Sequence, residues 1–129
     1  MKTFHYPIQI NQSDIDLLGH VNNVVYLLWV QQAAITHWDS LATADMQKNY
    51  SWVVSRHEID YLKAAYLNSK LIAHTWIGAS EGPRSIRFVE IKDAETNAIL
   101  AKIKTTWILL DASTKRPKRV TEELIAMFR

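Results

Sequence analysis

Residues 13–26, SDIDLLGHVNNVVY, pass directly from a polar turn into an apolar segment. The turn holds two aspartates, a glycine and a histidine, and two asparagines follow it. Residues 24–38 contain few turn formers and are long enough for several turns of helix. Asn22 or Asn23 is the expected N-cap, because an asparagine side chain accepts a hydrogen bond from a free N–H group of the first turn. The stretch therefore predicts a helix that starts beside a cluster of polar side chains.

The predicted helix is apolar on nearly all sides. Its apolar residues are Val24, Val25, Leu27, Leu28, Trp29, Val30, Ala33, Ala34 and Ile35. Its modest polar side consists of Gln31, Gln32, Thr36 and His37. A helix with this pattern is expected to be buried on most faces, as if a sheet were wrapped around it.

Most of the remaining sequence is predicted to form strands. Residues 3–10 alternate imperfectly between apolar and polar, and Pro7 favours an edge strand or a strand start. Four longer strands follow the helix, and turn residues separate them: residues 50–62, 70–80, 85–92 and 99–110. Residues 121–128 resemble a short helix capped by Thr121. We therefore expect one α+β domain, residues 1–129, with a five-stranded antiparallel sheet wrapped around one long central helix.

The composition indicates an ordinary folded protein without thiol chemistry. Of the 129 residues, 48% are hydrophobic and 22% are charged. There is no cysteine, which excludes disulfide bonds, thiolate metal ligands and a cysteine nucleophile. The five histidines show no metal-binding spacing, so we expect no metal site.

Charge and hydropathy indicate neither nucleic acid nor a membrane as a partner. The net charge of +2 is mild and is compatible with a small anionic ligand. The first residues lack the apolar run of a signal peptide, and no apolar run reaches the roughly 20 residues that cross a bilayer. We therefore expect a cytoplasmic protein.

The motif Asp-x-x-Gly-His-Val-Asn-Asn-x-x-Tyr, residues 16–26, carries a resemblance to a known family. It resembles the signature of hotdog-fold thioesterases related to 4-hydroxybenzoyl-CoA thioesterase and of short bacterial acyl-CoA thioesterases. Residues 13–16 and 20–23 also resemble the acyl-carrier-protein (ACP) thioesterases. The resemblance implies a hotdog fold that hydrolyses an acyl thioester, with acyl-CoA as the expected substrate. It implies no cofactor other than the coenzyme A of the substrate, and a homodimer or homotetramer, because the family's active site lies between two subunits.

The resemblance gives Asp16 the central chemical role. In the similar thioesterases, the carboxylate at this place attacks the thioester carbonyl or activates a water molecule that does so. Either role requires donors for the developing oxyanion, and we expect these to be the backbone N–H groups of Asn23 and Val24 at the helix start. His20 is expected to orient Asp16, to bind substrate or to hydrogen-bond across the loop. Asp14 is expected to be structural, because aspartates commonly hold turns.

Five further residues are candidates for contact with the substrate. Asn22 and Tyr26 belong to the motif, and Arg56, His57 and Arg87 are candidates for phosphate or pantetheine. The similar ACP enzymes carry a Glu-Cys pair where residues 64–65 of this sequence are both alanine, so that cysteine machinery is absent. Two alternatives remain open: an acyl-ACP thioesterase, and a hotdog protein that binds acyl thioesters without turnover. The length and aromaticity of the acyl group are not specified by the motif.

Overall fold

The computed structural model describes residues 2–129, and each predicted strand and helix is present within a few residues of its expected bounds. The elements in chain order are β1 (Phe4–Ile8), a short 3-10 helix (Gln12–Asp14), α1 (Asn23–Leu41), α2 (Ala44–Asn49), β2 (Tyr50–Tyr61), β3 (Leu71–Glu81), β4 (Arg84–Asp93), β5 (Ile99–Asp111) and α3 (Glu122–Met127). Within these described residues, no helix combines the length and the apolar character needed to cross a membrane.

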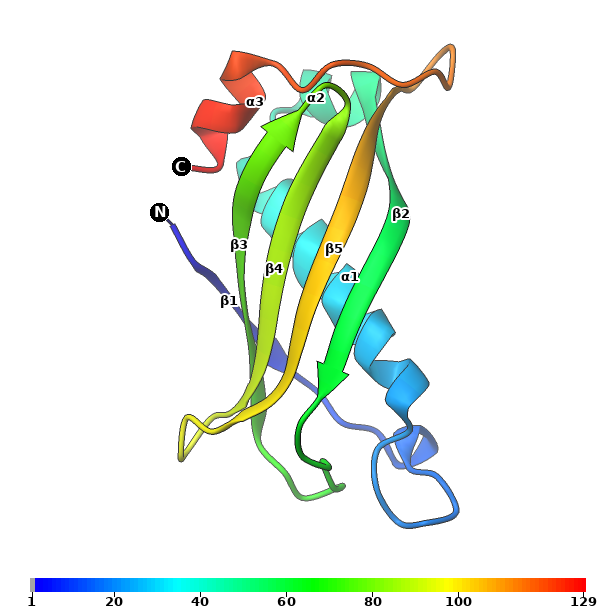
Figure 1. Cartoon of the computed structure of the whole chain (residues 1–129), viewed down its shortest axis with the longest axis vertical. Coiled ribbons are helices and arrows are strands. Elements are labelled where there is room, and N and C mark those ends of the chain that lie inside the picture. Colours follow the sequence, from blue (N-terminus) through cyan, green and yellow to red (C-terminus); the bar gives the residue numbers. More distant parts are fainter. Residues whose placement is uncertain (1) are drawn as a thin grey trace.

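The strands form one antiparallel sheet in the order β1-β3-β4-β5-β2. Figure 1 shows the sheet curving around α1, which runs across its concave face. β1 precedes α1 and β2 follows it, and the two strands form opposite edges of the sheet. The predicted α+β fold, a five-stranded antiparallel sheet around a long central helix, is therefore confirmed.

β3 and β4 form a hairpin, as the turn residues 81–84 between the two predicted strands indicate. Ser80 lies opposite Ser85, and Glu81 lies opposite Arg84. Gly82 turns the chain with a φ of +56°, a conformation that glycine adopts without steric cost.

The sequence of residues 50–62 predicts a regular alternation of two faces along β2, and this prediction is wrong. The pairing of β2 with β5 shifts between Val54 and Arg56, which leaves Ser55 as a bulge. A bulge reverses the phase of the strand, so even-numbered residues face inward before it and odd-numbered residues face inward after it. Trp52 accordingly packs against the core at one end of the molecule, and Ile59 packs against the core at the other end.

The core lies between α1 and the concave face of the sheet. At the closest contacts the side chains are small, since Ala33 of α1, Ala73 of β3 and Ala101 of β5 are all fully buried. Small side chains allow the helix to lie close to the sheet at interior packing density. A second, smaller cluster formed by Leu109, Val120 and Leu124 packs α3 against the end of the sheet.

The expectation that α1 is buried on most faces is wrong. One side is buried, but Val24, Leu28 and Ile35 on the other side are 68%, 51% and 54% exposed. These three residues follow helical spacing and form one apolar stripe, which we call the outer stripe of α1. His37, expected on the polar side, is only 4% exposed. The helix therefore has apolar residues on two sides, and the sheet covers only one of them.

Candidate functional site

Residues 15–21 form a tight turn that presents Asp16 at the start of α1. The N–H of Asp16 donates to the carbonyl oxygen of His20 at 2.9 Å. The N–H of Gly19 donates to the carbonyl oxygen of Asp16 at 3.1 Å. Gly19 has a φ of +88°, which other residues adopt only with strain, and a Cβ built on it would meet nothing within 4 Å. Gly19 is therefore required for its backbone conformation and not for close packing.

The Asp16 carboxylate is oriented by two backbone N–H donors of its own turn and by the nearby ring of His20. Its Oδ1 accepts from the N–H of Leu18 at 2.9 Å and from the N–H of His20 at 3.4 Å. Its Oδ2 lies 3.3 Å from Nδ1 of His20. The side chains of Asp16 and His20 are 27% and 34% exposed, so a solvent-borne ligand can reach both. The structure thus brings together the two predicted catalytic residues.

Backbone hydrogen bonds join this turn to the rest of the molecule. The N–H of Val21 donates to the carbonyl oxygen of Ala65 at 2.8 Å, and the N–H of Asn22 donates to that of Asp14 at 2.9 Å. Oδ2 of Asp14 accepts from the N–H of Asn11 at 2.8 Å and caps the short 3-10 helix. The structural role predicted for Asp14 is therefore confirmed.

The N-terminus of α1 offers one free donor instead of the predicted two. Oδ1 of Asn22 accepts from the N–H of Val24 at 3.1 Å, which makes Asn22 the N-cap. The Val24 N–H is therefore occupied, which corrects its assignment as an oxyanion donor. The N–H of Asn23 makes no hydrogen bond with any residue in the range 2–129. It lies at the positive end of the α1 dipole and remains the candidate.

Removal of the N-cap should destabilise the protein. Asn22→Ala is expected to lower the free energy of unfolding by about 1 kcal/mol, because the Val24 N–H loses its partner. Asn23→Ala is the matched control, since its side chain is exposed and makes no hydrogen bond within the described residues. The control should stay within about 0.5 kcal/mol of the wild type in urea unfolding. An equal loss in both variants would contradict the assignment of the cap.

Tyr26 is part of the core, which corrects its prediction as a substrate contact. It is 2% exposed, and its ring packs against the rings of Trp29 and Tyr61 with centroids 5.1 and 5.3 Å apart. Burial raises the pKa of its hydroxyl above the ordinary value, with a smaller contribution from Tyr61. The motif tyrosine therefore anchors the first turns of α1 against the sheet.

Arg56 and His57 lie on opposite faces of β2. Arg56 is exposed, with Nη2 at 3.4 Å from Oε1 of Glu58. His57 faces inward, with Nδ1 at 2.8 Å from Oγ1 of Thr105, and burial lowers its pKa. One ligand cannot contact both side chains from the same face of the strand. No group of three metal-ligating side chains occurs among residues 2–129.

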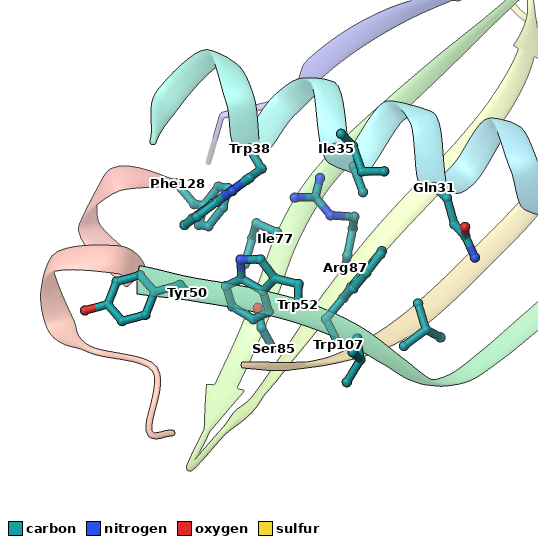
Figure 2. Close-up of a pocket in the computed structure, with 13 residues that line it drawn as sticks. Gln31, Ile35, Trp38, Tyr50, Trp52, Ile77, Ser85, Arg87, Trp107 and Phe128 are labelled. Carbon is teal, nitrogen blue, oxygen red and sulfur yellow. The ribbon is translucent and has the colours of Figure 1, made fainter. Parts of the chain in front are cut away.

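Arg87 lies in the wall of a cavity and not on the outer surface, so its prediction as a contact for the phosphates of a coenzyme is not supported. It is 4% exposed and lines a cavity of about 410 Å³ under the C-terminal half of α1. Figure 2 shows its guanidinium directed toward α1 among aromatic side chains. The cavity is lined by α1 residues 31–38 and not by Asp16 or His20, so the turn and the cavity lie at opposite ends of the helix.

The residues that surround Arg87 were not predicted as functional. Nη1 of Arg87 donates to Nδ1 of His37 at 3.0 Å and to Oγ1 of Thr75 at 2.9 Å. His37 and Thr75 are buried and come from α1 and β3. The sequence signal that could have revealed the burial of Arg87 is the alternation of residues 85, 87, 89 and 91. It places Arg87 on the same side of β4 as Val89 and Ile91.

The environment of His37 should make stability depend on pH. Burial, and then the charge of Arg87, lower the pKa of His37 to about 4. The unfolded chain takes up a proton at this residue near pH 6.5, whereas the folded chain does not until about pH 4. The stabilisation is therefore complete above about pH 6.5 and is lost as the pH falls toward 4, by up to about 3 kcal/mol. Urea unfolding at several pH values should show this loss of stability, and the substitution His37→Gln should reduce the dependence of stability on pH. An identical pH dependence in both proteins would contradict the assignment.

A comparison of the sequence with family models decides the family. The model of the acyl-ACP thioesterase N-terminal domain matches residues 1–128 of this chain. The chain belongs to the acyl-ACP thioesterase family. Membership of this family supports thioesterase activity on acyl thioesters.

Two curated relatives are similar over much of the chain. The chloroplastic palmitoyl-acyl carrier protein thioesterase of Gossypium hirsutum is 27% identical over 104 residues, which cover 74% of this chain. This chain spans only 25% of the length of that enzyme. The acyl-CoA thioester hydrolase YbgC of Escherichia coli is 22% identical over 129 residues, which cover 98% of this chain and 96% of YbgC.

The fold is that of solved thioesterases. The crystal structure of Slr0204, a 1,4-dihydroxy-2-naphthoyl-CoA thioesterase from Synechocystis, superimposes with a TM-score of 0.83 and 19% identity. The match covers 98% of this chain and 96% of the other. The hotdog fold implied by the sequence motif is therefore confirmed.

Proposed function

We propose that this acyl-ACP thioesterase family member hydrolyses acyl thioesters and that Asp16 starts the reaction. The observation that carries the proposal is the Asp16 carboxylate, which is held on an exposed turn directly before α1. Acyl transfer needs a nucleophile or base next to donors that stabilise an oxyanion. Asp16, His20 and the free N–H of Asn23 supply these groups within one segment of eight residues, 16–23.

Oδ2 of Asp16 is the oxygen to which we assign the reaction, because Oδ1 is engaged by two backbone N–H groups. In one route, Oδ2 attacks the thioester carbonyl, the thiolate leaves, and water hydrolyses the acyl-aspartyl anhydride. In the other route, Oδ2 removes a proton from water, the water oxygen attacks, and the tetrahedral intermediate expels the thiolate. Both routes yield a free acid and a thiol. A burst of thiol release before steady-state turnover would identify the covalent route.

The oxyanion is assigned to the N-terminus of α1. We assign the thioester oxygen to the N–H of Asn23, where the helix dipole also favours negative charge. His20 is assigned as the residue that orients Oδ2, since its Nδ1 lies 3.3 Å from that oxygen. Asn22 acts indirectly, by holding the first turn of α1 through its cap.

Acyl-CoA is the substrate class that we propose first, and acyl-ACP is the second. The alignment with 96% of the length of an acyl-CoA thioester hydrolase supports the first, and the matching family model supports the second. Thiol release from the CoA and ACP thioesters of the same acyl group tests both. Faster release from CoA supports the first assignment, and release from ACP alone would overturn it. We expect the same rates in EDTA, because the proposed reaction uses no metal.

We further propose that the active unit is a homodimer or a larger assembly. Asp16 lies outside the cavity under α1, so part of the wall around a bound thioester has to come from elsewhere. The outer stripe of α1 is exposed, and one of its residues, Ile35, also lines the cavity. The free edge of β2 carries Val53, which is 44% exposed and lines the same cavity. An apolar stripe next to an unpaired strand edge supports association with a second copy.

A further inference from the structure

The cavity under the C-terminal half of α1 is aromatic, with one cation in its wall. It has a volume of about 410 Å³, which is within the range of ligand-binding pockets. Figure 2 shows Trp38, Trp52 and Trp107 around it, with Phe128 at one end. Among the described residues that line it, Arg87 alone has a charged side chain.

The charge of Arg87 has no counter-charge within the described residues. No carboxylate among residues 2–129 forms an ion pair with it at 4.0 Å or less. Its Nη1 contacts His37 and Thr75, whereas Nε and Nη2 make no hydrogen bond within that range. His37 accepts from Arg87 through Nδ1, so it is neutral and cannot balance the charge. The ring of Phe128 covers the guanidinium, with its centroid 5.7 Å from the guanidinium carbon.

An unpaired buried cation is costly for a fold. Burial lowers the pKa of Arg87 to about 10, which leaves the side chain charged at neutral pH. An apolar side chain of similar volume would avoid the cost of removing this charge from water. A titratable group with a perturbed pKa in a cavity wall is a candidate for a functional site, and a cation at this place complements an anion.

A second donor lines the same cavity without a partner. Nε1 of Trp107 is buried and makes no hydrogen bond with the described residues. A buried indole N–H normally has an acceptor, because an unpaired donor costs free energy. Trp107 on β5 and Arg87 on β4 come from adjacent strands, and both side chains line the cavity. The two side chains therefore border one cavity, together with the polar side chains of Gln31, Tyr50 and Ser85.

We propose that this cavity binds the carboxylate of an apolar acid, with Arg87 as its counter-charge and Nε1 of Trp107 as a second donor. The inference rests on the proposed function for the origin of the acid. One origin is an acyl group that carries a second carboxylate at the end distant from the thioester. The other is the free acid that hydrolysis releases at Asp16 and that rebinds with its carboxylate at Arg87. From Asn23 to residues 31–38, α1 rises on the order of 12 to 22 Å, so the carboxylate lies well away from Asp16.

Direct binding tests the site without any need for turnover. Three tryptophans line the cavity, so intrinsic fluorescence should report the titration of dodecanoate and of the uncharged dodecan-1-ol. We expect the wild type to bind dodecanoate at least about tenfold more tightly than the alcohol, because a charged hydrogen-bonded contact is added. Arg87→Met should abolish this preference. Equal affinities in the wild type, or a preference that survives in Arg87→Met, would overturn the proposal.

Three further variants separate the binding role from a structural one. Arg84→Met is the matched control, because Arg84 is an exposed arginine on the same strand, and it should keep the full preference. Arg87→Lys should keep most of the preference because it keeps the charge. Trp107→Phe should weaken dodecanoate binding severalfold and weaken alcohol binding less, because the lost hydrogen bond is stronger to a charged acceptor. This variant also tests the site if Arg87→Met fails to fold. A parallel loss of both ligands in Trp107→Phe and Arg87→Lys would assign these residues to structure alone and overturn the proposal.

Kinetics distinguish the two origins of the acid. If the substrate carries the carboxylate, the CoA mono-thioester of dodecanedioate should be hydrolysed with a kcat/KM about tenfold above that of dodecanoyl-CoA, and Arg87→Met should remove the difference. If the product carries it, free dodecanoate should inhibit the hydrolysis of dodecanoyl-CoA, and Arg87→Met should relieve the inhibition. Absence of both effects would overturn the site. Absence of hydrolysis with carboxylate binding intact would instead overturn the proposed function.

Discussion

Asp16→Asn is expected to lower kcat for thioester hydrolysis by roughly 10²–10⁴-fold and to leave thioester binding nearly unchanged. The amide oxygen can occupy the place of Oδ1 and accept from the N–H groups of Leu18 and His20, so the turn should keep its shape. The amide nitrogen then replaces Oδ2, and it can neither attack a carbonyl nor accept a proton from water. The loss should therefore fall on kcat and not on affinity.

Asp14→Asn is the matched control for this variant. It makes the same chemical change two residues away, in a carboxylate that caps the 3-10 helix through the N–H of Asn11. Its amide oxygen can accept that hydrogen bond, so kcat should stay within about threefold of the wild type. Steady-state assays with both variants measure the difference. A similar loss of kcat in both variants would indicate that the shape of the turn, and not the Asp16 carboxylate, determines the rate.

Leu28→Asp is expected to convert the protein to a monomer and to lower kcat/KM by at least about a hundredfold. Leu28 is 51% exposed at the centre of the outer stripe of α1. A charge buried without a partner in an interface is strongly destabilising, at roughly 3–5 kcal/mol, which corresponds to more than a hundredfold in association. Leu28 lies on the side of α1 that faces away from the sheet, so the subunit itself should remain folded.

Thr36→Asp adds the same charge to an exposed position of α1 about 80° around the helix from Leu28. It should keep both assembly and activity. Analytical ultracentrifugation of the two variants and the wild type gives the number of subunits and distinguishes a dimer from a tetramer. A wild-type monomer with full activity would contradict the proposed assembly.

Local chemistry explains why much of the fold was predictable. A polar turn precedes Asn22 and an apolar helix follows it, so few other residues could cap this helix. Residues 99–110 alternate between apolar and polar side chains, which predicts a half-buried strand, and the observed β5 pairs with β2 on one side and with β4 on the other. The contact between Asp16 and His20 was equally predictable, since the two residues are four positions apart and the contact is local.

The errors share a physical cause, which is dependence on distant parts of the chain. The bulge at Ser55 exists only in the pairing of β2 with β5, so no local pattern predicts it. The burial of Arg87 depends on residues 12 and 50 positions away, Thr75 and His37. The apolar pattern of α1 was interpreted as burial within one subunit, because a sequence does not distinguish a face that packs on a sheet from one that packs on a partner.

A single-turnover experiment tests the central claim most directly, namely that Asp16 cleaves the thioester. Enzyme in excess is mixed with the acyl-CoA or acyl-ACP that the wild type prefers, and thiol and free acid are followed together. This design measures the chemical step without product release. The wild type should convert all bound thioester to acid and thiol, whereas Asp16→Asn should hold it bound and intact. Equal single-turnover rates in the two proteins, or intact bound thioester in the wild type, would contradict the account.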